Sequence, residues 1–193
     1  MKTKKMIINA ILIAIGVILH VATPSIGLPA QPDFALAMLF IIMLLNKDYK
    51  TTLFSGIIIG IFTALTTKTV GGQLPNIIDK LVTCNVMFLI LAPLRERVGK
   101  NVQAVILLLF GTALSGITFL TSLAIISGIE GAILLPILAI VIPTSIVNLV
   151  IGVMIYNVVE RVIRQLRFVM EWDLNKNRYE IMEEFHTYYF IFS

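Results

Sequence analysis

The sequence predicts an all-α integral membrane protein with six transmembrane helices and both termini in the cytoplasm. Three observations support this fold class. Of the 193 residues, 58% are hydrophobic and 13% are charged, and the mean hydropathy is +0.96. The charged residues gather at a few points between long apolar stretches, and the basic ones follow every second stretch. Soluble domains of this length are far more polar, whereas helices that face lipid require such a composition.

Six apolar stretches are candidate membrane spans. They cover residues 6–22, 34–45, 51–67, 76–94, 102–127 and 132–159. Most are long enough to cross a hydrocarbon core of about 30 Å at about 1.5 Å of rise per residue. The second stretch is the shortest, and its length alone would also suit a re-entrant segment.

The basic residues decide between these two interpretations of the second stretch. They precede the first stretch or follow the second, fourth and sixth: Lys2, Lys4, Lys5, Lys47, Lys50, Arg95, Arg97, Lys100, Arg161, Arg164 and Arg167. Cytoplasmic connections are enriched in Lys and Arg, so this alternation predicts six crossings with both ends inside. A re-entrant second stretch would place Lys47 and Lys50 on the outer side.

Several classes of chemistry lack their motifs in this sequence. The nearest match to an ATP-binding loop, GTALSGIT at residues 111–118, has Ile117 where the phosphate-binding lysine belongs. His20 and His186 stand far apart without an HExxH motif, and Cys84 is the only cysteine. We therefore expect that the protein is not an enzyme and that it binds no metal ion or cofactor. The net charge is +4, and the basic residues lie beside apolar stretches, which favours lipid headgroups over nucleic acid as their partner.

The most informative polar segment is TTKTVGGQLPNIIDKLVTCN, residues 66–85. Gly71 and Gly72 permit a tight turn on the outer side, and Pro75 would open the following helix. Asp79 and Lys80 then enter the membrane, where ionisable groups are costly and usually face a partner or a wet cavity. They are candidate substrate-binding residues.

A structural explanation of the same segment remains open. Asn76 and Asp79 have the spacing of a helix N-cap and its third residue, so they are also explained as a variant of the capping box. The two interpretations are compatible, because a helix N-terminus beside a lysine suits a carboxylate ligand. Gln73 is either a solvated loop residue or a ligand contact.

Three isolated polar residues also have more than one interpretation. Asn148, in the sixth stretch, is either an interhelical hydrogen bonder or a polar group in a cavity. For His20 an interfacial position is the default interpretation, and for Asp33 it is capping of the second helix.

Small residues recur at four-residue spacing, as Ala10 and Ala14 in the first stretch and as Gly56, Gly60 and Ala64 in the third. Such faces let helix backbones approach closely in lipid, and packing within the chain is the default explanation. Six spans in a short chain, the Ala10 and Ala14 motif and the run GGQLPNIIDK at residues 71–80 make residues 1–167 resemble the S components of energy-coupling factor (ECF) transporters. The run GGQLPNIIDK resembles most closely the tryptophan-specific S components.

This resemblance implies an S-component bundle that binds a small nutrient, here tryptophan, from outside. It also implies as partners a scaffold membrane subunit, onto which the Ala10 and Ala14 face docks, and two ATPases that supply energy. For tryptophan, Lys80 and the helix amides near Asn76 would receive the carboxylate, Asp79 the ammonium, and Gln73 or Asn148 the indole N–H.

Alternatives to this interpretation stay open from the sequence. They are a solitary permease, an S component for another micronutrient such as a vitamin, and a membrane scaffold without a ligand. Residues 168–193 do not match the family pattern and are expected to form a cytoplasmic tail with no assigned role.

Overall fold

The computed structural model describes residues 2–23, 32–128, 135 and 137–191, and in this part of the chain all regular structure is helical, as the sequence predicted. The helices are α1 (Lys2–Ala22), α2 (Phe34–Leu45), α3 (Tyr49–Leu65), α4 (Gln73–Leu94), α5 (Lys100–Ile106), the π-helical η1 (Leu107–Gly111), α6 (Thr112–Ser127), the π-helical η2 (Ile137–Val141) and α8 (Ile142–Ile191). The chain divides into two units, Met1–Val153 and Met154–Ser193, which we describe separately.

Four helical segments among the described residues are long and apolar enough to cross a membrane: Thr3–Ala22, Gln73–Leu94, Lys100–Ser127 and Leu138–Leu166. They include the first, fourth and fifth predicted spans and residues 138–159 of the sixth. Residues 132–134 and 136 of the sixth predicted span lie outside the described part. Helices α2 and α3 are apolar but shorter. Six crossings therefore remain a prediction.

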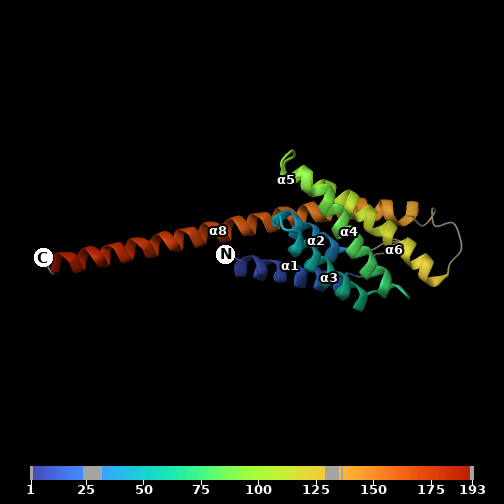
Figure 1. The fold of residues 1–193 in the computed structure, drawn as a ribbon, viewed down its shortest axis with the longest axis horizontal. Helices are drawn as coiled ribbons and strands as arrows, with labels where there is room; N and C mark the ends of the chain where they lie inside the picture. The colour runs from blue at the N-terminus through green and yellow to red at the C-terminus, as the bar shows by residue number, and fades with distance from the viewer. Residues whose placement is uncertain (1, 24–31, 129–134, 136, 192–193) are drawn as a thin grey trace. The chain divides into compact units, whose positions relative to one another are not determined.

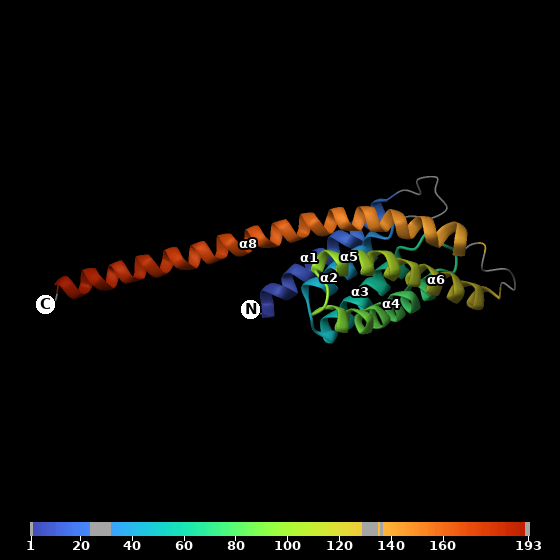
Figure 2. The ribbon, with the colours of Figure 1, turned by 90° about the horizontal axis from the view of Figure 1, so that it is seen from above.

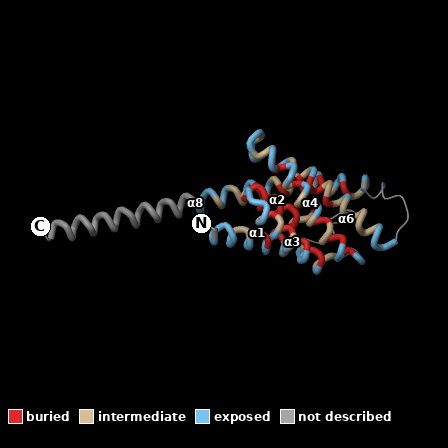
Figure 3. Tube along the Cα trace, in the orientation of Figure 1, coloured by how far each residue is buried: buried red, intermediate tan, exposed pale blue. Residues whose placement is uncertain are grey.

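Helix α2 is the core of the first unit. Every residue from Ala35 to Leu44 is buried. The helix contacts α1, α3, α4, α5 and η1, and it lies within this group of helices in Figures 1 and 2. Figure 3 shows buried residues concentrated here. A helix that is apolar on every face is suited to lipid or to enclosure by other helices, and here other helices enclose it.

The small-residue face of α3 packs against α4. A Cβ atom added at Gly56 would lie 2.7 Å from Sγ of Cys84, and one added at Gly60 would lie 3.3 Å from Cβ of Lys80. Internal packing, the default explanation for this motif, is thus confirmed at Gly56 and Gly60. The absence of side chains there brings α3 close to the polar segment of α4.

The predicted start of the fourth helix is wrong by about one turn. Helix α4 begins at Gln73 with Gly72 as its N-cap, so Asn76 and Asp79 lie inside the helix and form no capping box. Nδ2 of Asn76 instead donates a hydrogen bond to the Gly72 carbonyl, at 2.8 Å. Pro75 does not stop the helix, because the first turn needs no N–H donor from that position.

In the second unit, α8 continues through residue 191, and Arg164 forms an ion pair with Glu160, one turn away, at 2.8 Å. The expected boundary between a membrane domain and a tail after residue 167 remains a prediction.

Candidate substrate site

A cavity of about 600 Å³ opens within the first unit. Its lining comes from α1, α2, α4, α6, η2, α8 and the connection between α3 and α4. The lining residues are His20, Asp33, Leu36, Thr67, Lys68, Thr69, Asn76, Asp79, Lys80, Thr112, Ser115, Gly116, Phe119, Leu120, Leu123, Ile140, Val141 and Thr144. Three of the predicted site residues, Asn76, Asp79 and Lys80, are among them.

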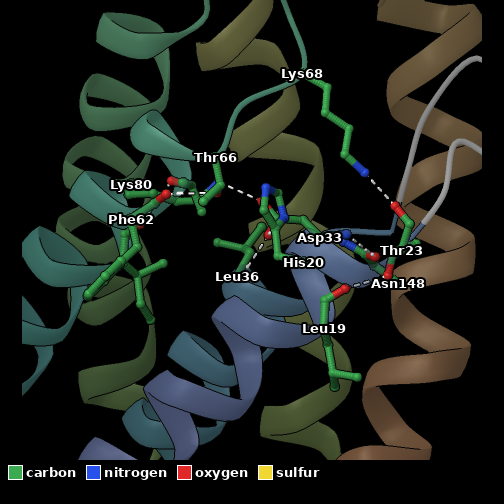
Figure 4. A network of polar contacts seen from close by, with 12 residues as sticks. Leu19, His20, Thr23, Asp33, Leu36, Phe62, Thr66, Lys68, Lys80 and Asn148 are labelled. Carbon is green, nitrogen blue, oxygen red and sulfur yellow. Dashed lines mark hydrogen bonds and ion pairs between the residues drawn. The ribbon is translucent and has the colours of Figure 1, made fainter.

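Lys80 lies between two carboxylates in this cavity. Its Nζ atom is 2.6 Å from Oδ2 of Asp33 (Figure 4) and 2.6 Å from Oδ2 of Asp79. Oδ1 of Asp79 also accepts a hydrogen bond from the hydroxyl of Thr83, at 3.2 Å. A buried lysine is stable only when paired and hydrogen-bonded, and here two acids supply that pairing. We call Asp33, Asp79 and Lys80 the acid–lysine cluster.

The three members of the cluster differ in exposure. The side chains of Lys80 and Asp79 are 1% and 2% exposed, whereas that of Asp33 is 19% exposed. Asp33 is therefore the member of the cluster that a ligand in the cavity reaches most easily.

Asp33 also caps helix α2, and its carboxyl is held in the ionised form. Its Oδ1 atom accepts the N–H of Leu36 at 2.9 Å, which caps α2 as the sequence predicted. Burial by itself would raise the pKa of this carboxyl, but the Lys80 ammonium and His20 outweigh burial and hold the pKa well below its usual range. Asp33 is ionised throughout the neutral pH range.

His20 faces Asp33 across a short gap. Its Nδ1 atom is 3.6 Å from Oδ1 of Asp33, which is too long for a hydrogen bond, and this buried nitrogen has no hydrogen-bond partner in the described part of the chain. Buried polar atoms are nearly always paired, so this nitrogen is available to a further hydrogen-bond partner in the cavity. The default interpretation of His20 as an interfacial residue gave no indication of this.

Asn148 supports the cluster from behind the cavity wall. Its Oδ1 atom accepts the backbone N–H of Asp33 at 3.0 Å, and its Nδ2 atom lies 3.4 Å from Oγ1 of Thr112, a lining residue. Asn148 is buried and is absent from the lining. Its contacts are the interhelical hydrogen bonds that formed one of the two predicted alternatives.

The connection between α3 and α4 supplies a cation to the cavity. Lys68 is a lining residue, and its Nζ atom donates a hydrogen bond to the Thr23 carbonyl at 2.6 Å. No acid lies within ion-pair distance of Lys68 among the residues that the structure describes. Gln73, by contrast, is exposed and outside the lining.

The rest of the wall is largely apolar. Its apolar members are Leu36, Phe119, Leu120, Leu123, Ile140 and Val141. Helix η1 ends directly before Thr112, and η2 contributes Ile140 and Val141. Such π-helical turns are rare and occur frequently at functional sites. The described residues contain no group of His, Cys, Asp and Glu suited to a metal ion.

Ala10 and Ala14 lie away from this cavity. Both are exposed on α1, together with Ile7, Ile11 and Ile18. Unlike the glycines of α3, they do not pack inside the first unit.

A family model described as "Tryptophan transporter TrpP" matches residues 2–164. The chain belongs to the TrpP tryptophan transporter family. It is therefore a multi-pass protein of the cell membrane, consistent with the four long apolar helical segments in the described part of the chain.

Named relatives agree with this membership. The chain is 46% identical over 172 residues to a probable tryptophan transport protein of Clostridium perfringens, covering 84% of this chain and 94% of the relative. Proteins with the same description from Clostridium acetobutylicum and Bacillus subtilis are 41% and 37% identical, covering 85% and 88% of this chain and 96% and 98% of their own. No solved structure matches the chain.

Proposed function

We propose that this TrpP-family protein binds tryptophan in the cavity of its first unit and carries it into the cell. The observation that supports the proposal most directly is the pairing of charged side chains with an apolar wall in a single cavity. Tryptophan requires both, because its ammonium and carboxylate need charged partners while its indole needs an apolar enclosure. The relatives of this chain are described as probable tryptophan transport proteins.

Within this proposal Asn76, Asp79 and Lys80 belong to the substrate site. Asn148 acts from behind it by holding the backbone of Asp33. Gln73 lies outside the cavity lining, so a role for it requires a contact at the entrance.

We further propose that transport is energised by a separate module of two ATPases and a scaffold membrane subunit, as the resemblance to ECF S components implies. The exposed face with Ala10 and Ala14 supports this, because small residues on a lipid-facing helix allow another helix to approach closely. The protein would then have high affinity and no transport activity alone.

The proposed topology has six crossings and cytoplasmic termini. Helix α2, with 12 residues, is too short to span about 30 Å alone, but it is enclosed by other helices, so its ends need not reach the lipid surface. Single cysteines at residues 50 and 69 in a Cys84→Ser background test this arrangement. An impermeant thiol reagent added to intact cells should label residue 69 and not residue 50; labelling of residue 50 would contradict six crossings.

Binding of radiolabelled tryptophan to the purified protein tests the function, with phenylalanine, tyrosine, riboflavin and biotin as competitors. Saturable binding that only unlabelled tryptophan displaces is expected without ATP. Tight binding of a vitamin instead would move the protein to another substrate, and no binding of any compound would favour a scaffold. Uptake by proteoliposomes that contain this protein alone would favour a solitary permease.

A further inference from the structure

With both carboxyls ionised and the imidazole of His20 neutral, the acid–lysine cluster has one net negative charge. Lys80 has one ammonium, and Asp79, the adjacent and equally buried residue, is sufficient to neutralise it. The second carboxylate, Asp33, adds a negative charge on the side of the cluster that faces the cavity. A charge in a wall of low polarity is costly unless a counter-charge joins it. The cavity therefore favours a cation at Asp33.

Asp33 and His20 together have the geometry of an ammonium site. The carboxylate oxygen Oδ1 and the unpartnered Nδ1 of His20 are 3.6 Å apart, and the neutral imidazole nitrogen can accept a hydrogen bond. An ammonium group has three N–H donors, so one placed between these atoms donates to both. It would satisfy the buried nitrogen and the excess carboxylate at once.

Lys80 is poorly placed to receive a ligand carboxylate. Its Nζ atom already contacts two carboxylates at 2.6 Å, and a third anion would be repelled by both. Lys68 lines the same cavity and has no such competitor among the described residues, where its Nζ atom donates a hydrogen bond to a neutral carbonyl. A charged carboxylate is the stronger partner for an ammonium.

We propose, resting on the tryptophan-binding function above, that Asp33 and His20 receive the ammonium of the ligand, that Lys68 receives its carboxylate, and that Lys80 is a positioning residue which holds Asp33 in place. The ligand class is then zwitterionic α-amino acids with an apolar side chain. This changes the roles that the sequence suggested for Asp79 and Lys80, and it adds three residues that the sequence did not single out for the substrate.

Tryptophan analogues that lack one charge test this assignment. Tryptamine keeps the ammonium and lacks the carboxylate, whereas indole-3-propionate keeps the carboxylate and lacks the ammonium. Binding of each compound to the full-length purified protein can be measured by its stabilisation of the protein against thermal unfolding, alongside displacement of radiolabelled tryptophan. Both analogues should bind more weakly than tryptophan.

Two variants separate the charges. Asp33→Asn retains a side-chain oxygen that caps α2, and Lys68→Met alters an exposed connection, so both should fold. Asp33→Asn should lower the affinity for tryptophan and tryptamine by roughly 10- to 100-fold, the range for hydrogen bonds to charged groups. It should leave the affinity for indole-3-propionate unchanged or higher. Lys68→Met should lower the affinity for tryptophan and indole-3-propionate and leave that for tryptamine unchanged.

His20 and Lys80 provide further readouts. His20→Leu should lower the affinity for tryptophan and tryptamine and leave that for indole-3-propionate unchanged. Lys80→Arg should retain tryptophan binding. Lys80→Met should lower the affinity for tryptophan and for tryptamine by the same factor, because Lys80 acts through Asp33.

The assignment is overturned if Lys80→Met lowers the affinity for tryptophan but not for tryptamine. It is also overturned if Asp33→Asn lowers the affinity for all three compounds equally. If the unaltered protein binds no tryptophan, the proposed function fails and this assignment fails with it. If it binds tryptophan but these analogue preferences are absent, only the assignment fails.

Discussion

Nζ of Lys80 on α4 lies 2.6 Å from Oδ2 of Asp33, which precedes α2 and is 47 positions away in the chain. Lys80 forms a second ion pair with Asp79, so the two ion pairs connect the N-terminus of the core helix α2 with the part of α4 that lines the cavity. They link the stability of the first unit to the geometry of the proposed substrate site.

Replacing Lys80 with Met should destabilise the protein strongly. The change leaves Asp33 and Asp79 close together without their shared cation, and removing one partner of a buried ion pair costs about 3–5 kcal/mol. Thermal unfolding in detergent, without ligand, measures the effect. The double variant Asp79→Asn with Lys80→Met should recover part of the loss because it removes one of the two repelling charges. Equal stability of Lys80→Met and the unaltered protein would contradict the contacts described above.

Phe119→Ala should weaken tryptophan binding. Phe119 is in the apolar wall of the cavity, and loss of an aromatic contact with its buried area corresponds to about 1–3 kcal/mol, or roughly 5- to 150-fold in affinity. Phe110→Ala is the matched control, since Phe110 is 60% exposed in η1 and absent from the lining. Equilibrium binding of radiolabelled tryptophan to both variants decides; equal losses would place the indole elsewhere.

Gly111→Ala should destabilise the first unit, because an added Cβ atom would overlap the ring of Phe40 in the buried core helix α2. Overpacking of a core costs about 1–3 kcal/mol. Gly99→Ala is the control, since nothing lies within 4 Å of its added Cβ atom and its backbone φ of −64° suits alanine. The unfolding temperatures of the two variants should therefore differ, with Gly111→Ala the lower; the reverse order would argue against this packing.

The helical class followed directly from the sequence, because apolar stretches of this length have few other stable forms in lipid. The polar segment of α4 was also found from its residue types, since Asp79 and Lys80 are conspicuous in an apolar helix. Local sequence could not reveal their partner. Asp33 looked like an ordinary N-cap, which it is, and its second role depends on a contact between residues distant in sequence.

The start of α4 was misplaced for a local reason. Pro75 and Asn76 have typical helix-start chemistry, but Gly72 and Gln73 already have helical hydrogen bonding, with the N–H of Asn76 bonded to the Gly72 carbonyl at 3.0 Å. One signal for Asp33 was available. A lysine predicted to be inside the membrane requires acids nearby, and few acids lie in the connections predicted to be on the outer side.

Ala14→Trp should separate binding from transport. Ala14 is exposed on α1 and is absent from the lining of the cavity, so a bulky side chain there should leave tryptophan affinity unchanged. If the face with Ala10 and Ala14 docks on a scaffold subunit, the indole of the new residue prevents close approach of the partner helix, and uptake should be abolished.

Phe54→Trp is the matched control for Ala14→Trp, since Phe54 is 64% exposed on α3 and tryptophan there adds bulk to a different face. Binding to purified protein and uptake by cells that contain the ATPase module should be measured for both variants. Loss of uptake in Ala14→Trp alone, with binding retained in both, is expected. Normal uptake by Ala14→Trp would remove this face as the docking site, because no closely packed helix interface tolerates so large an insertion.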